Sequence, residues 1–118
     1  MLGGRRADLH EDGGGARDDV GLLDLGDGVL SGRKVFAEAG DGVRFDNIRL
    51  DTEGRLWAAA LDDGVHCYDP DGTLIGRLRI PERVSNIAFG GPKNNRMFIT
   101  ASSSLYSLVM SVTGAPRL

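Results

Sequence analysis

The sequence predicts an all-β protein that forms part of a β-propeller. Apolar and polar residues alternate over short stretches bounded by turn residues, as in strands with one buried face. Glycine accounts for 18 of the 118 residues, about twice the usual ~7%, which suits many tight turns between short strands. Several segments also return after about 40 residues, and a repeat of that length with three or four strands is typical of a propeller blade.

Three pairs of segments carry this repeat. Trp57 and Phe98 fall at matching positions, which is what packing between neighbouring blades requires. We therefore expect both rings to belong to the core. The matching pairs are Asn47-Ile48 with Asn86-Ile87, Arg55-Leu56-Trp57 with Arg96-Met97-Phe98, and Val65-His66-Cys67-Tyr68 with Leu105-Tyr106-Ser107-Leu108.

The first part of the chain differs from the rest. Residues 1–20 are rich in glycine and charge, so they are expected to be disordered, because they bury too little apolar surface to offset conformational entropy. A propeller fragment is expected over 21–115, followed by a short tail over 116–118. Within the fragment, 21–25 and 30–38 are expected to form a strand pair, the outer strands of a blade that lacks its inner strands.

About two four-stranded antiparallel blades are expected after this pair. The first has strands over 48–50, 56–60, 65–68 and 74–80, joined by acidic turns. Gly54 closes the first of these turns, where a positive φ is expected. The second blade has strands over 87–89, 97–100 and 105–110.

Four segments follow one another in order over residues 46–91. They are Asp46-Asn47-Ile48-Arg49-Leu50-Asp51, Gly54-Arg55-Leu56-Trp57, Val65-His66-Cys67-Tyr68-Asp69-Pro70-Asp71-Gly72 and Asn86-Ile87-Ala88-Phe89-Gly90-Gly91. Together these segments resemble the C-terminal blades of the SMP-30/gluconolactonase/LRE family. The resemblance covers roughly 24–115 and implies a six-bladed propeller, of which this chain holds a fragment. It also implies a parent activity, the metal-dependent hydrolysis of a sugar lactone to its aldonic acid.

Asp46 is the main candidate for chemistry. It precedes an inner strand, so it is expected at the mouth of the central channel of a propeller. A carboxylate there can bind a divalent cation or act as a general base, although an Asx turn at the strand entry is the structural alternative. The resemblance assigns Asp46 both roles, metal ligand and catalytic base, and implies Ca²⁺, Mg²⁺, Mn²⁺ or Zn²⁺ as cofactor.

Two asparagines are weaker candidates for substrate binding. Asn47 stands where the family usually has glycine, and its amide is expected either to support the turn or to reach the channel. Asn86 occupies the equivalent position of the next blade, where a turn-forming role is the alternative. The family's other metal ligands belong to earlier blades without counterparts here, so the fragment is expected to be inactive or weakly active.

Two further residues are interpreted as structural. Cys67 lies in an alternating strand and is expected to be a small buried side chain rather than a nucleophile. His66, beside it, is expected to be a satisfied or exposed strand histidine rather than a metal ligand.

Composition excludes several partners. A net charge of −3 gives no basic footprint for nucleic acid. The sequence has no apolar run of the ~18 residues needed to cross a membrane and no signal peptide, so a cytoplasmic protein is expected. The expected partners are a sugar lactone and other copies that pair through exposed blade edges. A non-catalytic interaction module and the non-functional product of a truncated gene remain alternatives, so enzymatic activity is left open.

Overall fold

The computed structural model describes residues 5–10, 19–26, 29–38 and 43–115, and in that part of the chain all regular elements are strands. No helix long and apolar enough to cross a membrane occurs among these residues. The strands are β1 (Arg5–His10), β2 (Asp19–Gly26), β3 (Val29–Glu38), β4 (Asn47–Leu50), β5 (Leu56–Ala59), β6 (Val65–Tyr68), β7 (Leu74–Leu78), β8 (Val84–Gly90), β9 (Arg96–Ala101) and β10 (Leu105–Val109).

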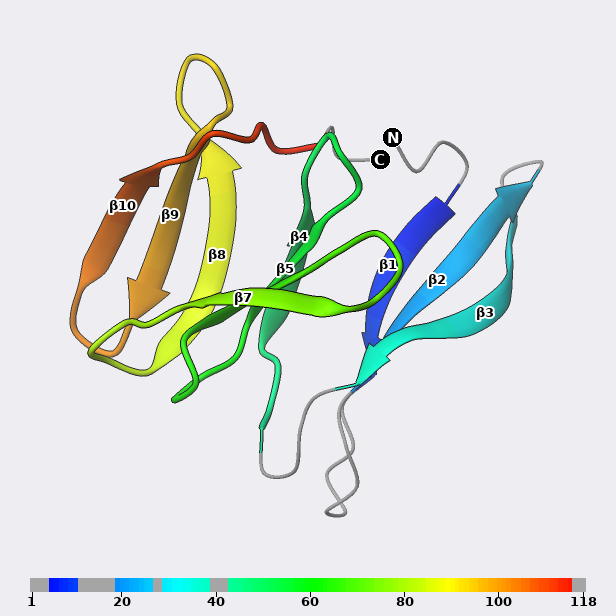
Figure 1. Ribbon diagram of the computed structural model, residues 1–118, viewed down its shortest axis with the longest axis horizontal. Coiled ribbons are helices and arrows are strands. Elements are labelled where there is room, and N and C mark those ends of the chain that lie inside the picture. The colour runs from blue at the N-terminus through cyan, green and yellow to red at the C-terminus, as the bar shows by residue number, and fades with distance from the viewer. Residues whose placement is uncertain (1–4, 11–18, 27–28, 39–42, 116–118) are drawn as a thin grey trace.

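The strands form three antiparallel sheets, in the orders β1-β2-β3, β4-β5-β6-β7 and β10-β9-β8. The sheets fan out side by side, with β4–β7 between the other two (Figure 1). The first strand of each sheet lies innermost, because β4 contacts both β1 and β8. This arrangement confirms the predicted propeller fragment. The expected four strands are found in the middle sheet, whereas the β8–β10 sheet has three.

Two apolar cores lie between the sheets, because the side chains of β5 point alternately to its two faces. Leu56 and Ala58 point to one side of the strand while Trp57 and Ala59 point to the other. The first core consists of Phe45, Leu56, Ala58, Ala60 and Tyr68. The second core consists of Trp57, Ala59, Val65, Cys67, Val84, Ile87, Met97 and Ile99.

Glycines close the turns of the middle sheet. Gly54 has a φ of 81°, which confirms the positive φ predicted for the first acidic turn. Gly64 has a φ of 79°, and a Cβ atom there would lie 2.1 Å from the carbonyl oxygen of Leu78. Glycine is therefore required at this position by both backbone conformation and space.

The structure differs from the sequence expectation at the start of the chain. Arg5–His10, expected to be disordered, form β1 and pair with β2 along their whole length. Leu9 packs against the first core, so tertiary contacts supply the apolar burial that the local sequence lacks. The strand pair expected next is confirmed as β2 and β3, but β1 provides the inner strand that was expected to be missing. Residues 1–4 and 11–18 lie outside the described residues, as do the connections 27–28 and 39–42 and the tail 116–118.

The segment after β10 returns to the middle sheet. The Thr52 amide donates to the carbonyl of Thr113 at 2.8 Å, and the Ala115 amide donates to the carbonyl of Leu50 at 2.9 Å. An antiparallel bridge joins Asp51 to Gly114 between them. This return fastens the third sheet to the turn between β4 and β5.

Candidate functional site

Asp46 lies directly before β4, the inner strand of the middle sheet. Its backbone amide donates to the carbonyl of Ala59 at 2.8 Å, so the main chain is fixed to β5. The side chain is exposed, and among the described residues no hydrogen bond or ion pair engages its carboxylate. A fixed backbone with a free carboxylate is suited to binding a cation or accepting a proton.

Asn47 joins the inner strands of two sheets. Its Oδ1 accepts a hydrogen bond from the Ile87 amide at 2.9 Å, and its Nδ2 donates to the Ile87 carbonyl at 3.0 Å. Asn47 is part of β4 rather than a left-handed turn, since the described non-glycine residues with positive φ are Leu61 and Asn94. The structure gives this amide a backbone partner, and its contact with a substrate stays a prediction.

Asn86 is exposed on β8, one residue before the residue that Asn47 binds. Its backbone carbonyl accepts a hydrogen bond from the Thr100 hydroxyl at 3.5 Å. Within the part of the chain that the structure describes, its side-chain amide makes no hydrogen bond. The backbones of Asp46, Asn47 and Asn86 thus lie near one junction, where β4 meets β8. The Asn86 side chain, however, lies on the opposite face of β8 from the buried Ile87.

The donors at this junction fit a hard cation only in part. A carboxylate oxygen is a ligand type that Ca²⁺ and Mg²⁺ prefer, but tight Ca²⁺ sites use 6–8 oxygens. No group of three or more His, Cys, Asp or Glu side chains that could hold a metal occurs among the described residues. The Asp46 carboxylate is therefore one oxygen donor of the type that these cations prefer.

Asp51, which opens the first acidic turn of the middle sheet, has a structural role that the sequence analysis did not predict. The residue as a whole is 2% exposed, and its side chain is fully buried. Oδ1 accepts hydrogen bonds from the amides of Glu53 and Arg55 at 2.9 and 3.0 Å, and Oδ2 accepts one from Trp57 Nε1 at 3.1 Å. The Arg55 guanidinium lies 3.4 Å from Oδ2. The first acidic turn thus contains a buried carboxylate whose two oxygens are both paired and which orients the Trp57 ring. The spacing of six residues from Asp51 to Trp57 is the sequence feature that could have predicted this contact.

His66 belongs to a buried polar group away from the junction. Its Nδ1 lies 3.1 Å from the hydroxyl of Tyr68, and its Nε2 lies 2.5 Å from Oδ2 of Asp63. The Phe45 ring packs edge-on against both rings. Burial raises the pKa of Tyr68 to about 12, so the phenol stays neutral. These contacts support the prediction that His66 is a satisfied strand histidine.

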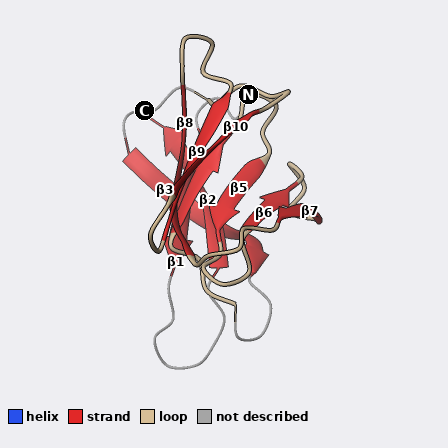
Figure 2. Ribbon diagram, turned by 90° about the vertical axis from the view of Figure 1, so that its left-hand side faces the viewer, coloured by secondary structure: helices blue, strands red, loops and turns tan. Residues whose placement is uncertain are grey.

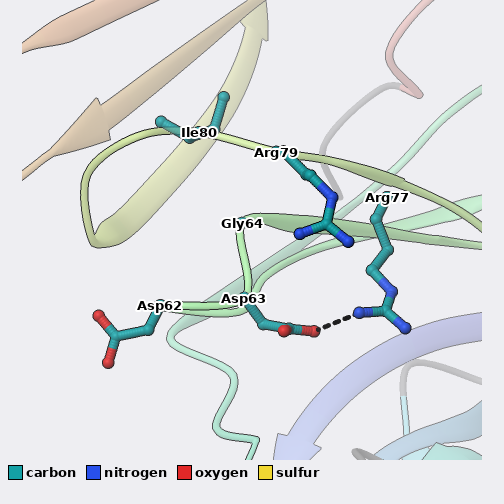
Figure 3. Close-up of a pocket in the computed structure, with 6 residues that line it drawn as sticks. All are labelled: Asp62, Asp63, Gly64, Arg77, Arg79 and Ile80. Atoms are coloured by element: carbon teal, nitrogen blue, oxygen red, sulfur yellow. Dashed lines mark hydrogen bonds and ion pairs between the residues drawn. The ribbon is translucent and has the colours of Figure 1, made fainter.

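A shallow pocket lies beside this group, near β7 (Figure 3). The Arg77 guanidinium is 3.3 Å from the Asp63 carboxylate, so the carboxylate that contacts His66 is also paired with a positive charge. None of the site residues predicted from the sequence lines the pocket. Its lining residues are Asp62, Asp63, Gly64, Arg77, Arg79 and Ile80.

Cys67 is buried in the second core, which supports its prediction as a structural residue. Burial raises the pKa of its thiol from 9.0 to about 11. Because the thiolate is the nucleophilic form, this side chain is unreactive at neutral pH.

A comparison with protein families shows to which family the chain belongs. Residues 19–103 match the family model described as the SMP-30/gluconolactonase/LRE-like region. The chain belongs to this family. The resemblance seen in the four sequence motifs is therefore confirmed over most of the chain.

Individual relatives agree with the family match. The pentonolactonase XacC of Haloferax volcanii is 31% identical over 112 residues, which cover 76% of this chain and 38% of that protein. A regucalcin of Danio rerio is 33% identical over 84 residues, covering 67% of this chain and 28% of that protein. Among solved structures, the Xanthomonas campestris gluconolactonase XC5397 superposes with a TM-score of 0.71 at 28% identity, covering 92% of this chain and 34% of that one. The SMP-30/gluconolactonase-like chain thus spans about a third of the length of these relatives.

Proposed function

We propose that this chain carries part of the active site of a metal-dependent sugar-lactone hydrolase, with Asp46 as its metal ligand and general base. The observation that carries the proposal is the exposed Asp46 carboxylate, free of partners among the described residues, at the head of an inner strand. Relatives named pentonolactonase and gluconolactonase support a sugar lactone as substrate and an aldonic acid as product.

The residues around Asp46 hold its main chain in place. The hydrogen bond from its amide to Ala59 fixes the main chain, and the Asn47–Ile87 contact fixes β4 against β8. A divalent metal, when bound, would polarise the lactone carbonyl and acidify a water molecule. Asp46 would then accept the proton of the attacking water through its free oxygen. Asn47 and Asn86 remain predicted substrate contacts at the same junction.

We further propose that the chain alone is inactive or weakly active. One carboxylate completed by water would bind Mg²⁺ or Ca²⁺ weakly, because tight binding needs several oxygens held by the protein. The chain spans 38% of the pentonolactonase and 34% of the gluconolactonase, so the relatives' remaining ligands have room to lie elsewhere in those proteins.

Thermal unfolding with millimolar Ca²⁺, Mg²⁺, Mn²⁺ or Zn²⁺ tests the metal assignment. A ligand that binds only the folded state raises the unfolding temperature, so one of these metals should raise it for the wild-type chain. Asp46→Asn should abolish the rise. Asp62→Asn is the matched control, because the Asp62 side chain is 79% exposed and lies outside the junction. An equal rise in Asp46→Asn, or no rise with any metal, would contradict the assignment.

Lactone hydrolysis, followed by the acid released from a gluconolactone at constant pH, tests the activity. We expect turnover close to the uncatalysed rate for the purified chain. Robust metal-dependent turnover would overturn the proposed inactivity. If Asp46→Ala abolished that turnover, the assignment of Asp46 to the reaction would nevertheless stand.

A further inference from the structure

The β8–β10 sheet has one face that no other described sheet covers. The middle sheet, in contrast, packs one face against the β1–β3 sheet and the other against the β8–β10 sheet. In the middle sheet, Trp57 and Val65 lie on the face that meets the β8–β10 sheet, where they are 8% and 0% exposed. The neighbouring sheet is what buries them.

The residues at equivalent places of the next repeat are uncovered. Leu105 corresponds to Val65 and is 66% exposed, and Val109, on the same side of β10, is 67% exposed. Phe98 corresponds to Trp57 and pairs across the sheet with Ala88 and Ser107. We call the surface formed by Ala88, Phe98, Leu105 and Val109 the open face; Figure 2 views the molecule from the side of this sheet.

Asn86 repeats the position of Asn47 in the same way. The Asn47 amide brackets the backbone of Ile87, on the inner strand of the following sheet. The Asn86 amide is exposed and makes no hydrogen bond within the described residues. It is therefore placed to bracket the backbone of a further inner strand.

We propose that the open face binds the β1–β3 sheet of a second copy of this chain, with Asn86 bracketing β1 of that copy. The inner strands lie in the order β1, β4, β8, since β4 contacts both of the others. No described sheet precedes the β1–β3 sheet, so the face of that sheet on the far side from β4 is the one that a second copy can meet. Each copy supplies three sheets. Two copies joined head to tail in both directions would form a closed dimer, in which the last sheet of each copy meets the first sheet of the other.

Sedimentation velocity of the full chain over a range of concentrations tests the docking. We expect a dimer of two 12.6 kDa chains. Leu105→Glu and Val109→Glu should each give monomers, and both positions are exposed enough that the monomer should keep its circular dichroism spectrum. Ile75→Glu is the control, because Ile75 is 53% exposed on β7, away from the open face. It should leave the dimer intact.

A second variant tests the role given to Asn86. Asn86→Ala should raise the dimer dissociation constant about a hundredfold, because a closed pair of copies contains this contact twice and each contact loses two ordinary hydrogen bonds. If Asn86 instead contacts only a substrate, the dissociation constant will not change, and this part of the proposal fails. A monomer at all concentrations, open-ended polymers, or a dimer broken by Ile75→Glu rather than Leu105→Glu would each overturn docking through the open face. The last outcome would point to pairing through strand edges.

Discussion

Asn47 binds both backbone groups of Ile87, its Oδ1 lying 2.9 Å from the Ile87 nitrogen and its Nδ2 lying 3.0 Å from the Ile87 oxygen. The two residues are on the inner strands of different sheets, which share no ladder of backbone hydrogen bonds. The side-chain amide therefore takes the place of a peptide group and satisfies β8 where a strand partner is absent. This contact fixes how the third sheet sits against the second.

Removing the Asn47 amide should weaken the packing of the third sheet against the second and so lower the stability of the fold. Asn47→Ala leaves the half-buried amide and carbonyl of Ile87 without their partner, which typically costs about 1–3 kcal/mol of unfolding free energy. Urea unfolding followed by the fluorescence of Trp57 would measure the change. Lys93→Ala, at an exposed position, is the control. A loss no greater than that of the control would mean that the contact adds nothing to stability.

Asp51 should be more sensitive to substitution than other acidic turn residues. Asp51→Ala leaves two backbone amides and the Trp57 indole N–H without their acceptor. We expect a loss of about 3 kcal/mol and a changed Trp57 emission spectrum in the folded state. Asp62→Ala removes a carboxylate that is 79% exposed and should change neither. Similar effects of the two substitutions would refute the role of Asp51 as a buried acceptor.

The Cys67 thiol should report unfolding. With a pKa raised to about 11 by burial, it should react with iodoacetamide at pH 8 far more slowly than the same thiol in the urea-unfolded chain. Labelling followed by mass spectrometry gives both rates. Equal rates in the folded and unfolded chain would show that the second core is open to solvent.

Acid should weaken the contact between the β7–β8 connection and the β9–β10 turn. Hydrogen bonds chiefly from Ser103, and then from Ser104 and Tyr106, lower the pKa of Glu82 from 4.5 to about 2. A lowered folded-state pKa gives stability that is present above pH 4.5 and is lost as the pH falls toward 2.

The variant Glu82→Gln isolates this effect. Because glutamine does not titrate, the variant should lose less stability than the wild type between pH 4.5 and 2, as measured by thermal unfolding across that range. Asp62→Asn should follow the wild type, since Asp62 is largely exposed. Parallel curves for Glu82→Gln and the wild type would show that the Glu82 contacts do not stabilise the fold.

The repeat made most of the fold predictable from sequence. Period-2 alternation around 48–50 and 65–68 marked β4 and β6, the repeat marked β10 at 105–110, and the structure confirms all three with small shifts at their ends. Those patterns are local, so they are visible in one short stretch. The sequence analysis did not predict β1, because this strand is stabilised by its pairing with β2 and by the contact of Leu9 with the first core. Both contacts depend on residues that lie elsewhere in the sequence.

The place of Asp46 along the chain fold could be predicted from the sequence, but the contacts of its neighbours could not. The motif placed Asp46 at the entry to an inner strand, as the structure shows. The contact between Asn47 and Ile87 could not be anticipated, because it joins residues 40 positions apart on different sheets. The return of Thr113 and Ala115 to the middle sheet was missed for the same reason, since that segment has no periodicity of its own.

The burial of every residue of β5 and β6 has a consequence for the order in which the chain opens. In stacked repeats each unit is stabilised mainly by its neighbours, so a unit flanked on both sides is the last to lose protection from hydrogen exchange. In a single copy of the chain, the middle sheet is the unit flanked on both sides. Fluctuations should therefore begin at strands such as β10, which is largely exposed, and move inward. The segment that carries Asp46 then lies next to the slowest-exchanging amides of the molecule.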